Sequence, residues 1–148
     1  MGQFESIANK MVSYRSKTSW LSIEKYYNVL ANNNDGSLSM AFVLLAINNE
    51  KGTTVTSIAP RIGMEPNSLS RILKKLIEKK FVFKKKSKTD KRKVYICLTK
   101  LGIEKQTLAI EKLHVLEKNI NEIVTKEQLK SYFIVNDAIV SAISKLKT

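Results

Sequence analysis

The chain has 148 residues, 43% hydrophobic and 26% charged with a net charge of +13, a composition that fits one globular domain and excludes a disordered polymer. The longest uncharged apolar run has ten residues (38–47) and charges interrupt every apolar stretch near the start, so we expect no membrane span, no signal peptide and a cytoplasmic location. One cysteine and one histidine provide neither an internal disulfide nor a cluster of metal ligands, and we expect no metal and no cofactor.

The N-terminal part of the chain is predicted to form a long, interrupted amphipathic helix. Its apolar residues recur at spacings of three and four between Phe4 and Leu30, and the pattern stops at the turn-forming cluster Asn32–Gly36. Ser39 is then expected to cap a second helix, Met40–Asn49, whose centre is apolar on every side and should therefore be buried.

The next two helices have the spacing of a helix-turn-helix over residues 55–74. A short helix is expected at Thr56–Ile62, Gly63 supplies the turn, and Pro66 suits the first position of the following helix because it has no N–H to leave unpaired. Apolar residues share one face of that second helix, and polar or basic residues share the other. Such a unit holds a recognition helix so that its N-terminal half can enter a major groove, although an ordinary helical hairpin explains the same spacing.

The pattern then becomes β-prone. The runs Phe81–Phe83 and Val94–Leu98 predict a hairpin around the polar segment Lys84–Lys93, in which seven of the ten residues are Lys or Arg. Cys97 lies in the second run, and we expect it to be inert core.

Two further helices are predicted to complete the chain. Thr99 should cap the first, and Thr125 with Gln128 forms a capping box for the last. The last helix repeats apolar residues at heptad spacing from Leu129 to Leu146, with one polar member, which is typical of a seam that packs against other helices.

The positive charge is concentrated in one part of the chain. Residues 61–100 hold 14 Lys and Arg against three acidic residues, a local net charge of +11, whereas residues 1–60 and 101–148 each carry +1. This concentration indicates a surface that faces a polyanion. A solvated basic face without a partner is the alternative interpretation.

Over essentially its whole length, the sequence resembles the MarR (multiple antibiotic resistance regulator) family of winged helix-turn-helix transcription factors. The resemblance rests on residues 58–63, 66–76 and 79–82, and most specifically on Asp90-x-Arg92 and Leu98-Thr99-x-x-Gly102. It implies a mainly α fold in one MarR-like domain over residues 1–148, with a winged helix-turn-helix part at about 36–100 and dimerisation helices at about 1–31 and 101–148.

Three positions depart from the family pattern. Pro60 falls inside the supporting helix and should weaken or kink it unless it lies in the first turn. Glu65 replaces the Ser, Asp or Asn expected as the cap of the recognition helix, and Phe81 stands where a glycine is common. These departures bear on local geometry rather than on the fold.

The resemblance also implies which residues contact DNA. It assigns the reading of base edges to Asn67, Ser68, Ser70 and Arg71, and phosphate contacts to Lys74, Lys75, Lys88 and Lys91. Arg71 can bind guanine O6 and N7 bidentately. In the wing, Arg92 would enter the minor groove and Asp90 would orient it, a simple turn-forming role being the alternative for Asp90.

The chain is therefore expected to be a homodimeric, sequence-specific regulator of transcription, a repressor rather than an activator, that binds a palindromic operator in double-stranded DNA. Four aromatic residues of the N-terminal helix could line a pocket for a small-molecule effector of unknown identity, or could serve core or dimer packing: Trp20, Tyr14, Tyr26 and Tyr27. The alternative function is a winged-helix protein that binds nucleic acid without sequence preference, as an architectural protein does. No nucleophile–base constellation indicates an enzyme.

Overall fold

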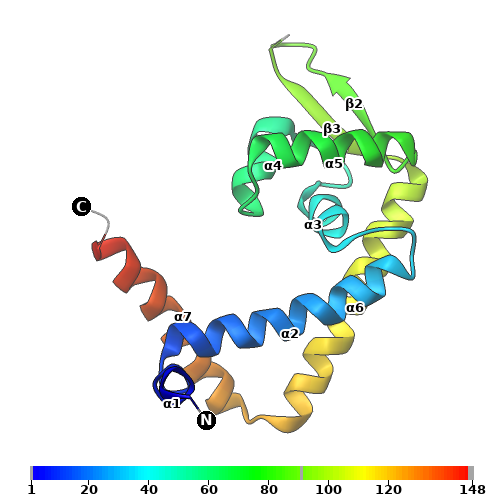
Figure 1. Cartoon of the computed structure of the whole chain (residues 1–148). Helices are drawn as coiled ribbons and strands as arrows, with labels where there is room; N and C mark the ends of the chain where they lie inside the picture. The colour runs from blue at the N-terminus through cyan, green and yellow to red at the C-terminus, as the bar shows by residue number, and fades with distance from the viewer. Residues whose placement is uncertain (1, 91, 147–148) are drawn as a thin grey trace. The chain divides into compact units, whose positions relative to one another are not determined.

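The structure is a computed structural model that describes residues 2–90 and 92–146. Its elements, in chain order, are α1 (Gln3–Ala8), α2 (Val12–Asn32), α3 (Leu38–Ala46), β1 (Thr53–Thr54), α4 (Val55–Arg61), α5 (Pro66–Glu78), β2 (Val82–Lys86), β3 (Val94–Leu98), α6 (Lys100–Ile123) and α7 (Lys126–Leu146) (Figure 1). The chain divides into two compact units, Met1–Ala109 and Ile110–Thr148, and α6 runs from the first into the second. The predicted mainly α architecture with an antiparallel hairpin is confirmed.

The core of the first unit is formed where α3, α4 and α5 pack against the sheet. Its most completely buried side chains come from all of these elements: Val43, Ile58, Leu76, Val82 and Ile96. The apolar centre of α3 is buried, as its composition predicts. The core leaves α5 with one free face and lets the hairpin of β2 and β3 extend beyond it (Figure 1).

The sheet has three antiparallel strands in the order β1–β3–β2, one more than the predicted hairpin. The additional strand, β1, has two residues, too few to show the alternation by which a sequence indicates a strand. In the hairpin, Val82 pairs with Leu98 and Lys84 with Ile96. Because side chains alternate across a strand, these residues share the face that packs on the core.

The second helix begins and ends earlier than expected. Ser37, and not Ser39, is its cap: the Ser37 Oγ accepts from the backbone N–H of Met40 at 3.3 Å. α3 ends at Ala46 rather than Asn49, because the Asn48 Oδ1 accepts from the next backbone amides, Glu50 N at 3.1 Å and Lys51 N at 2.8 Å, and so forms a turn.

Long-range hydrogen bonds satisfy the carbonyls at the end of α3. The buried Gln106 of α6 donates from Nε2 to Leu44 O (2.7 Å) and Ile47 O (2.8 Å). Thr53 Oγ1 (3.3 Å) and Arg61 Nη1 (3.2 Å) donate to the carbonyl of Ala46. These partners lie 7 to 62 residues away in sequence, so no local pattern reveals them.

Two other local expectations are modified by the structure. Pro60 lies in the last turn of α4 and not in the first, and the helix ends one residue later at Arg61, shortly before Gly63 with its φ of 63°. Cys97 is half-buried, so its interpretation as core is wrong. Its neighbours Ile96 and Leu98 are buried, and the alternation of β3 turns Cys97 to the other face.

The second unit consists of the end of α6 and of α7. The predicted capping box is confirmed, because Thr125 N donates to Gln128 Oε1 (2.8 Å) and Gln128 N donates to Thr125 Oγ1 (3.1 Å). α7 has no buried residue, and most of its large apolar side chains are exposed: Tyr132, Phe133, Ile134, Val135, Val140, Ile143 and Leu146. Within the part of the chain that the structure describes, no helix is long and apolar enough to cross a membrane.

Candidate nucleic-acid interface

The free face of α5 carries the residues that the sequence assigns to DNA. Leu69, Leu73 and Leu76 are buried on one side of the helix. All six predicted contact residues of α5 are exposed: Asn67, Ser68, Ser70, Arg71, Lys74 and Lys75. The division between the two faces gives a helix that is anchored by leucines and presents amide, hydroxyl, guanidinium and ammonium groups to solvent.

The N-terminus of α5 has no side-chain cap. Glu65 occupies the cap position without a side-chain hydrogen bond to the helix, as its departure from the family pattern predicts, and Pro66 at the first position has no N–H. The Ser70 Oγ donates back to Pro66 O at 3.1 Å. Its oxygen can still accept a hydrogen bond, whereas its proton is used within the helix.

α5 ends in a turn whose key residue, Lys80, has an unusual backbone conformation. Lys80 has φ 59°, the left-handed region that a glycine usually occupies after a helix, and the hydrogen bonds Lys80 N–Ile77 O and Phe81 N–Leu76 O (both 2.9 Å) complete a Schellman motif. Phe81, which stands where a glycine is common in the family, is buried. Sequence reasoning missed the role of Lys80, because a lysine gives no sign of positive φ.

The start of α6 is attached to the end of α5. Thr99 Oγ1 donates to Lys80 O (2.6 Å), Thr99 N donates to Phe81 O (3.0 Å), and Gly102 N donates to the Thr99 Oγ1 (3.0 Å). A Cβ on Gly102 would overlap the carbonyl oxygen of Phe81. The Leu-Thr-x-x-Gly motif therefore has a physical role: Thr99 caps α6, as predicted, and Gly102 lets α6 approach the segment that follows the recognition helix.

The wing is a hairpin with a hydrogen-bonded tip. Ser87 N donates to Lys93 O (3.0 Å), and the Ser87 Oγ accepts from Asp90 N (3.2 Å). Lys88 is exposed, Arg92 has 94% of its side chain exposed, and Asp90 lies 3.6 Å from the Arg92 Nε. Lys91 lies outside the described residues. The structure thus brings Asp90 and Arg92 together at the tip, some distance along the hairpin from α5.

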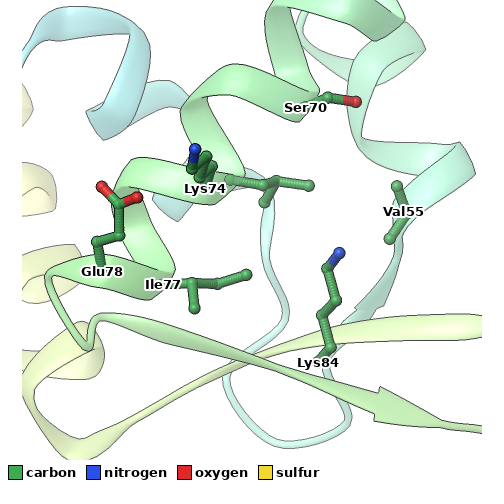
Figure 2. Close-up of a pocket in the computed structure, with 7 residues that line it drawn as sticks. Val55, Ser70, Lys74, Ile77, Glu78 and Lys84 are labelled. Carbon is green, nitrogen blue, oxygen red and sulfur yellow. The ribbon is translucent and has the colours of Figure 1, made fainter.

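A groove of about 510 Å³ lies between α5 and the wing. Its apolar lining comes from Val55, Leu73 and Ile77, and its polar lining from Ser70, Lys74, Glu78 and Lys84 (Figure 2). Sequence reasoning did not assign Lys84 or the groove, because the three adjacent lysines of β2 look alike until their register is known.

The aromatic residues of α2 are involved in packing. Trp20 stacks on Phe42 of α3 with ring centroids 6.3 Å apart, and the centroids of Tyr26 and Tyr27 are 5.3 Å apart. Tyr14 meets Phe4 of α1 edge to face at 5.8 Å. These contacts support the packing interpretation of the aromatic residues.

Comparisons with known proteins agree with this geometry. The model of the MarR family matches residues 37–94. The transcriptional regulator SarZ of Staphylococcus haemolyticus is 32% identical over 79 residues, 53% of this chain and 54% of SarZ. The chain thus spans about half the length of the curated relatives it matches.

Two solved structures have the same fold at low sequence identity. A crystal structure of a MarR family transcription regulator matches 98% of this chain and 97% of its own with a TM-score of 0.82 at 15% identity. The complex of Staphylococcus aureus MepR with DNA matches 89% of this chain and 98% of its own, with a TM-score of 0.80 at 18% identity. The fold is therefore a winged helix-turn-helix.

Proposed function

We propose that the chain is a winged helix-turn-helix protein of the MarR family and acts as a cytoplasmic transcriptional repressor that binds a palindromic operator as a homodimer. Members of this family are DNA-binding regulators and not enzymes, in agreement with the prediction from the sequence. The observation that carries the proposal is the exposed polar face of α5, with the basic wing beside it.

In this proposal, α5 enters the major groove of double-stranded DNA. Asn67, Ser68, Ser70 and Arg71 read base edges there, and Lys74 and Lys75 hold phosphates. At the wing, Arg92 enters the minor groove beside Asp90, and Lys88 and Lys91 contact the flanking phosphates. The local charge of +11 over residues 61–100 supports this assignment, because counterion release favours basic surfaces on DNA.

The homodimer is proposed from the apolar surface of the terminal helices. In α7 every residue is at least partly exposed, and Ile143 is 49% exposed, so one chain by itself leaves this seam in water. In the first unit, Phe4 and Ile7 of α1 are 69% and 54% exposed. We propose residues 1–31 and 101–148 as dimerisation helices of one MarR-like domain, and a small-molecule effector of unknown identity as its regulator.

Selection of bound sequences from random duplex DNA tests the proposal. The purified protein should enrich a motif with two-fold symmetry. With roughly 6–10 phosphate contacts, affinity for that motif should fall by about 10³–10⁵ between 50 and 200 mM salt. Binding without an enriched motif, equally competed by random duplex, would instead favour the architectural alternative, and binding with a flat salt dependence would exclude DNA as the partner.

A further inference from the structure

Three consecutive lysines of β2 lie on two different faces of the sheet. Lys84, Lys85 and Lys86 are all exposed. Lys84 pairs with the buried Ile96, whereas Lys85 pairs with Tyr95. Because successive side chains of a strand point to opposite faces, Lys84 and Lys86 share the core-facing side of the wing, and Lys85 is on the outer side.

The side chain of Lys84 extends into the groove beside the recognition helix. It lines the groove together with Ser70 and Lys74 of α5 and Val55 of α4. Figure 2 shows the ammonium group of Lys84 rising from the strand into the space bounded by Ser70, Val55 and Ile77. The groove thus combines apolar lining with two basic residues, Lys74 from α5 and Lys84 from β2.

These cations are not neutralised within the described ranges 2–90 and 92–146. The ion pair of Arg92 with Asp90 is the one salt bridge found there, and Lys74 and Lys84 take part in no hydrogen bond. Glu78 is the acidic residue of the groove lining, and Figure 2 shows its carboxylate directed away from Lys84. Because Lys74 and Lys84 both line the groove and neither is paired within those ranges, their two positive charges favour an anion there.

We propose that this groove holds one sugar–phosphate strand of the DNA, with Lys74 on the helix side and Lys84 on the wing side. The inference rests on the proposed function. If α5 occupies the major groove and the tip of the wing the adjacent minor groove, the strand that separates the two grooves must pass between α5 and β2. Lys86 continues the same row toward the tip of the wing, and Lys85 on the outer face makes no contact with DNA.

The test compares Lys84→Gln with Lys85→Gln in the 148-residue chain. The two variants remove the same charge from adjacent, exposed positions of one strand and shorten the side chain equally, so thermal unfolding should be the same for both. Binding is measured on a duplex of mixed sequence, because phosphate contacts do not depend on the bases. The slope of log affinity against log salt should become shallower by about 1 per bound protomer for Lys84→Gln, and should stay at the wild-type value for Lys85→Gln.

Lys84→Arg keeps the positive charge, so its slope of log affinity against log salt should equal that of the wild type. Equal slopes for Lys84→Gln and Lys85→Gln would overturn the inference, since charge alone and not the face of the strand would then matter. Wild-type protein without salt-dependent binding to the duplex would be a different result, because it overturns the proposed function itself.

Discussion

Asp90 holds Arg92 by two contacts at the tip of the wing: its Oδ1 accepts from the backbone N–H of Arg92 at 3.0 Å and lies 3.6 Å from the Arg92 Nε. The first contact shapes the turn, and the second pairs with the guanidinium group. The two roles considered for Asp90 from the sequence, turn former and partner of Arg92, are thus combined in one carboxylate. The Arg92 side chain nevertheless remains 94% exposed, so its guanidinium group is accessible from solvent.

Arg92→Ala should weaken operator binding and remove any preference for A/T pairs flanking the half-sites, because an arginine in the minor groove gains most where A-tracts narrow it. Asp90→Ala should have the same two effects on operator binding and flank preference, but to a smaller extent. Asp90→Asn keeps the acceptor for the Arg92 amide and should retain most of the flank preference. The measurement is quantitative binding to operators with A/T or G/C flanks. Tighter binding by Asp90→Ala with the preference intact would limit Asp90 to the turn.

Arg71→Ala and Lys74→Ala should impair binding in different ways, although both side chains are exposed on α5. Loss of a bidentate contact to guanine should cost about 1–3 kcal/mol and relax the preference at one position per half-site. Loss of a phosphate contact should weaken specific and random duplexes alike. Competition with both kinds of duplex distinguishes the two effects. If Arg71→Ala reduces both affinities equally, Arg71 does not read a base.

Aspartate at both Ile139 and Ile143 should dissociate the proposed dimer, because these residues lie one turn apart in the α7 seam. Burying an unpaired carboxylate costs several kcal/mol per ion. The control is the double change Ser141→Asp and Ser144→Asp, which adds the same charge on the other side of the helix. Sedimentation should show a monomer for the first variant and a dimer for the control, and a dimer in both cases would remove α7 from the interface.

The fold could be predicted largely because its signals are local. Each of these signals acts on residues within a few positions, and the structure has each at its expected place: the turn cluster after α2, Pro66 at the start of α5, Thr99 before α6 and the Thr125–Gln128 box. The cap of α3 shows the limit of this reasoning. Two serines two residues apart are both possible caps, and the structure has Ser37 as the cap.

What could not be predicted depends on residues that are distant in sequence. Gln106 supports the end of α3 from about 60 residues away. The faces of Lys84 and Lys85 follow from the register with Ile96 and Tyr95, which a run of identical residues does not reveal. At the site, the sequence could indicate which residues of α5 are exposed, but the groove beside them exists because the wing approaches the helix.

Gly102→Ala should destabilise the protein, because the added Cβ would overlap the carbonyl oxygen of Phe81. Overpacking of this kind costs about 1–3 kcal/mol, and here it would also strain the bonds that Thr99 makes to the end of α5. Gly36→Ala is the matched control, since its Cβ would meet Ala31 O at an ordinary 3.6 Å. Chemical denaturation gives both unfolding free energies. Equal values would show that α6 can move away from Phe81 at little cost.

Lys80→Gly should make the protein more stable, an unusual direction for a change to glycine. Lys80 has φ 59°, and the left-handed conformation costs a residue with a Cβ about 1–2 kcal/mol that glycine does not lose. Two terms oppose the gain: glycine is more flexible in the unfolded chain, and the lysine charge favours the C-terminal end of the α5 dipole. Their sum should leave a net gain of up to about 1 kcal/mol in the unfolding free energy.

The control for Lys80→Gly is Lys79→Gly. Lys79 has φ −76°, a right-handed conformation in which a Cβ causes no strain, so this variant loses the same charge without the conformational benefit. It should be no more stable than the wild type. The hydrogen bond from Thr99 Oγ1 should be kept in both variants, because it goes to the backbone carbonyl of residue 80 and not to a side chain. Denaturant unfolding of the two variants in parallel measures the difference. If Lys80→Gly and Lys79→Gly lose stability equally, the strain at Lys80 is too small to matter, and the hydrogen bonds of the Schellman motif alone determine how α5 ends.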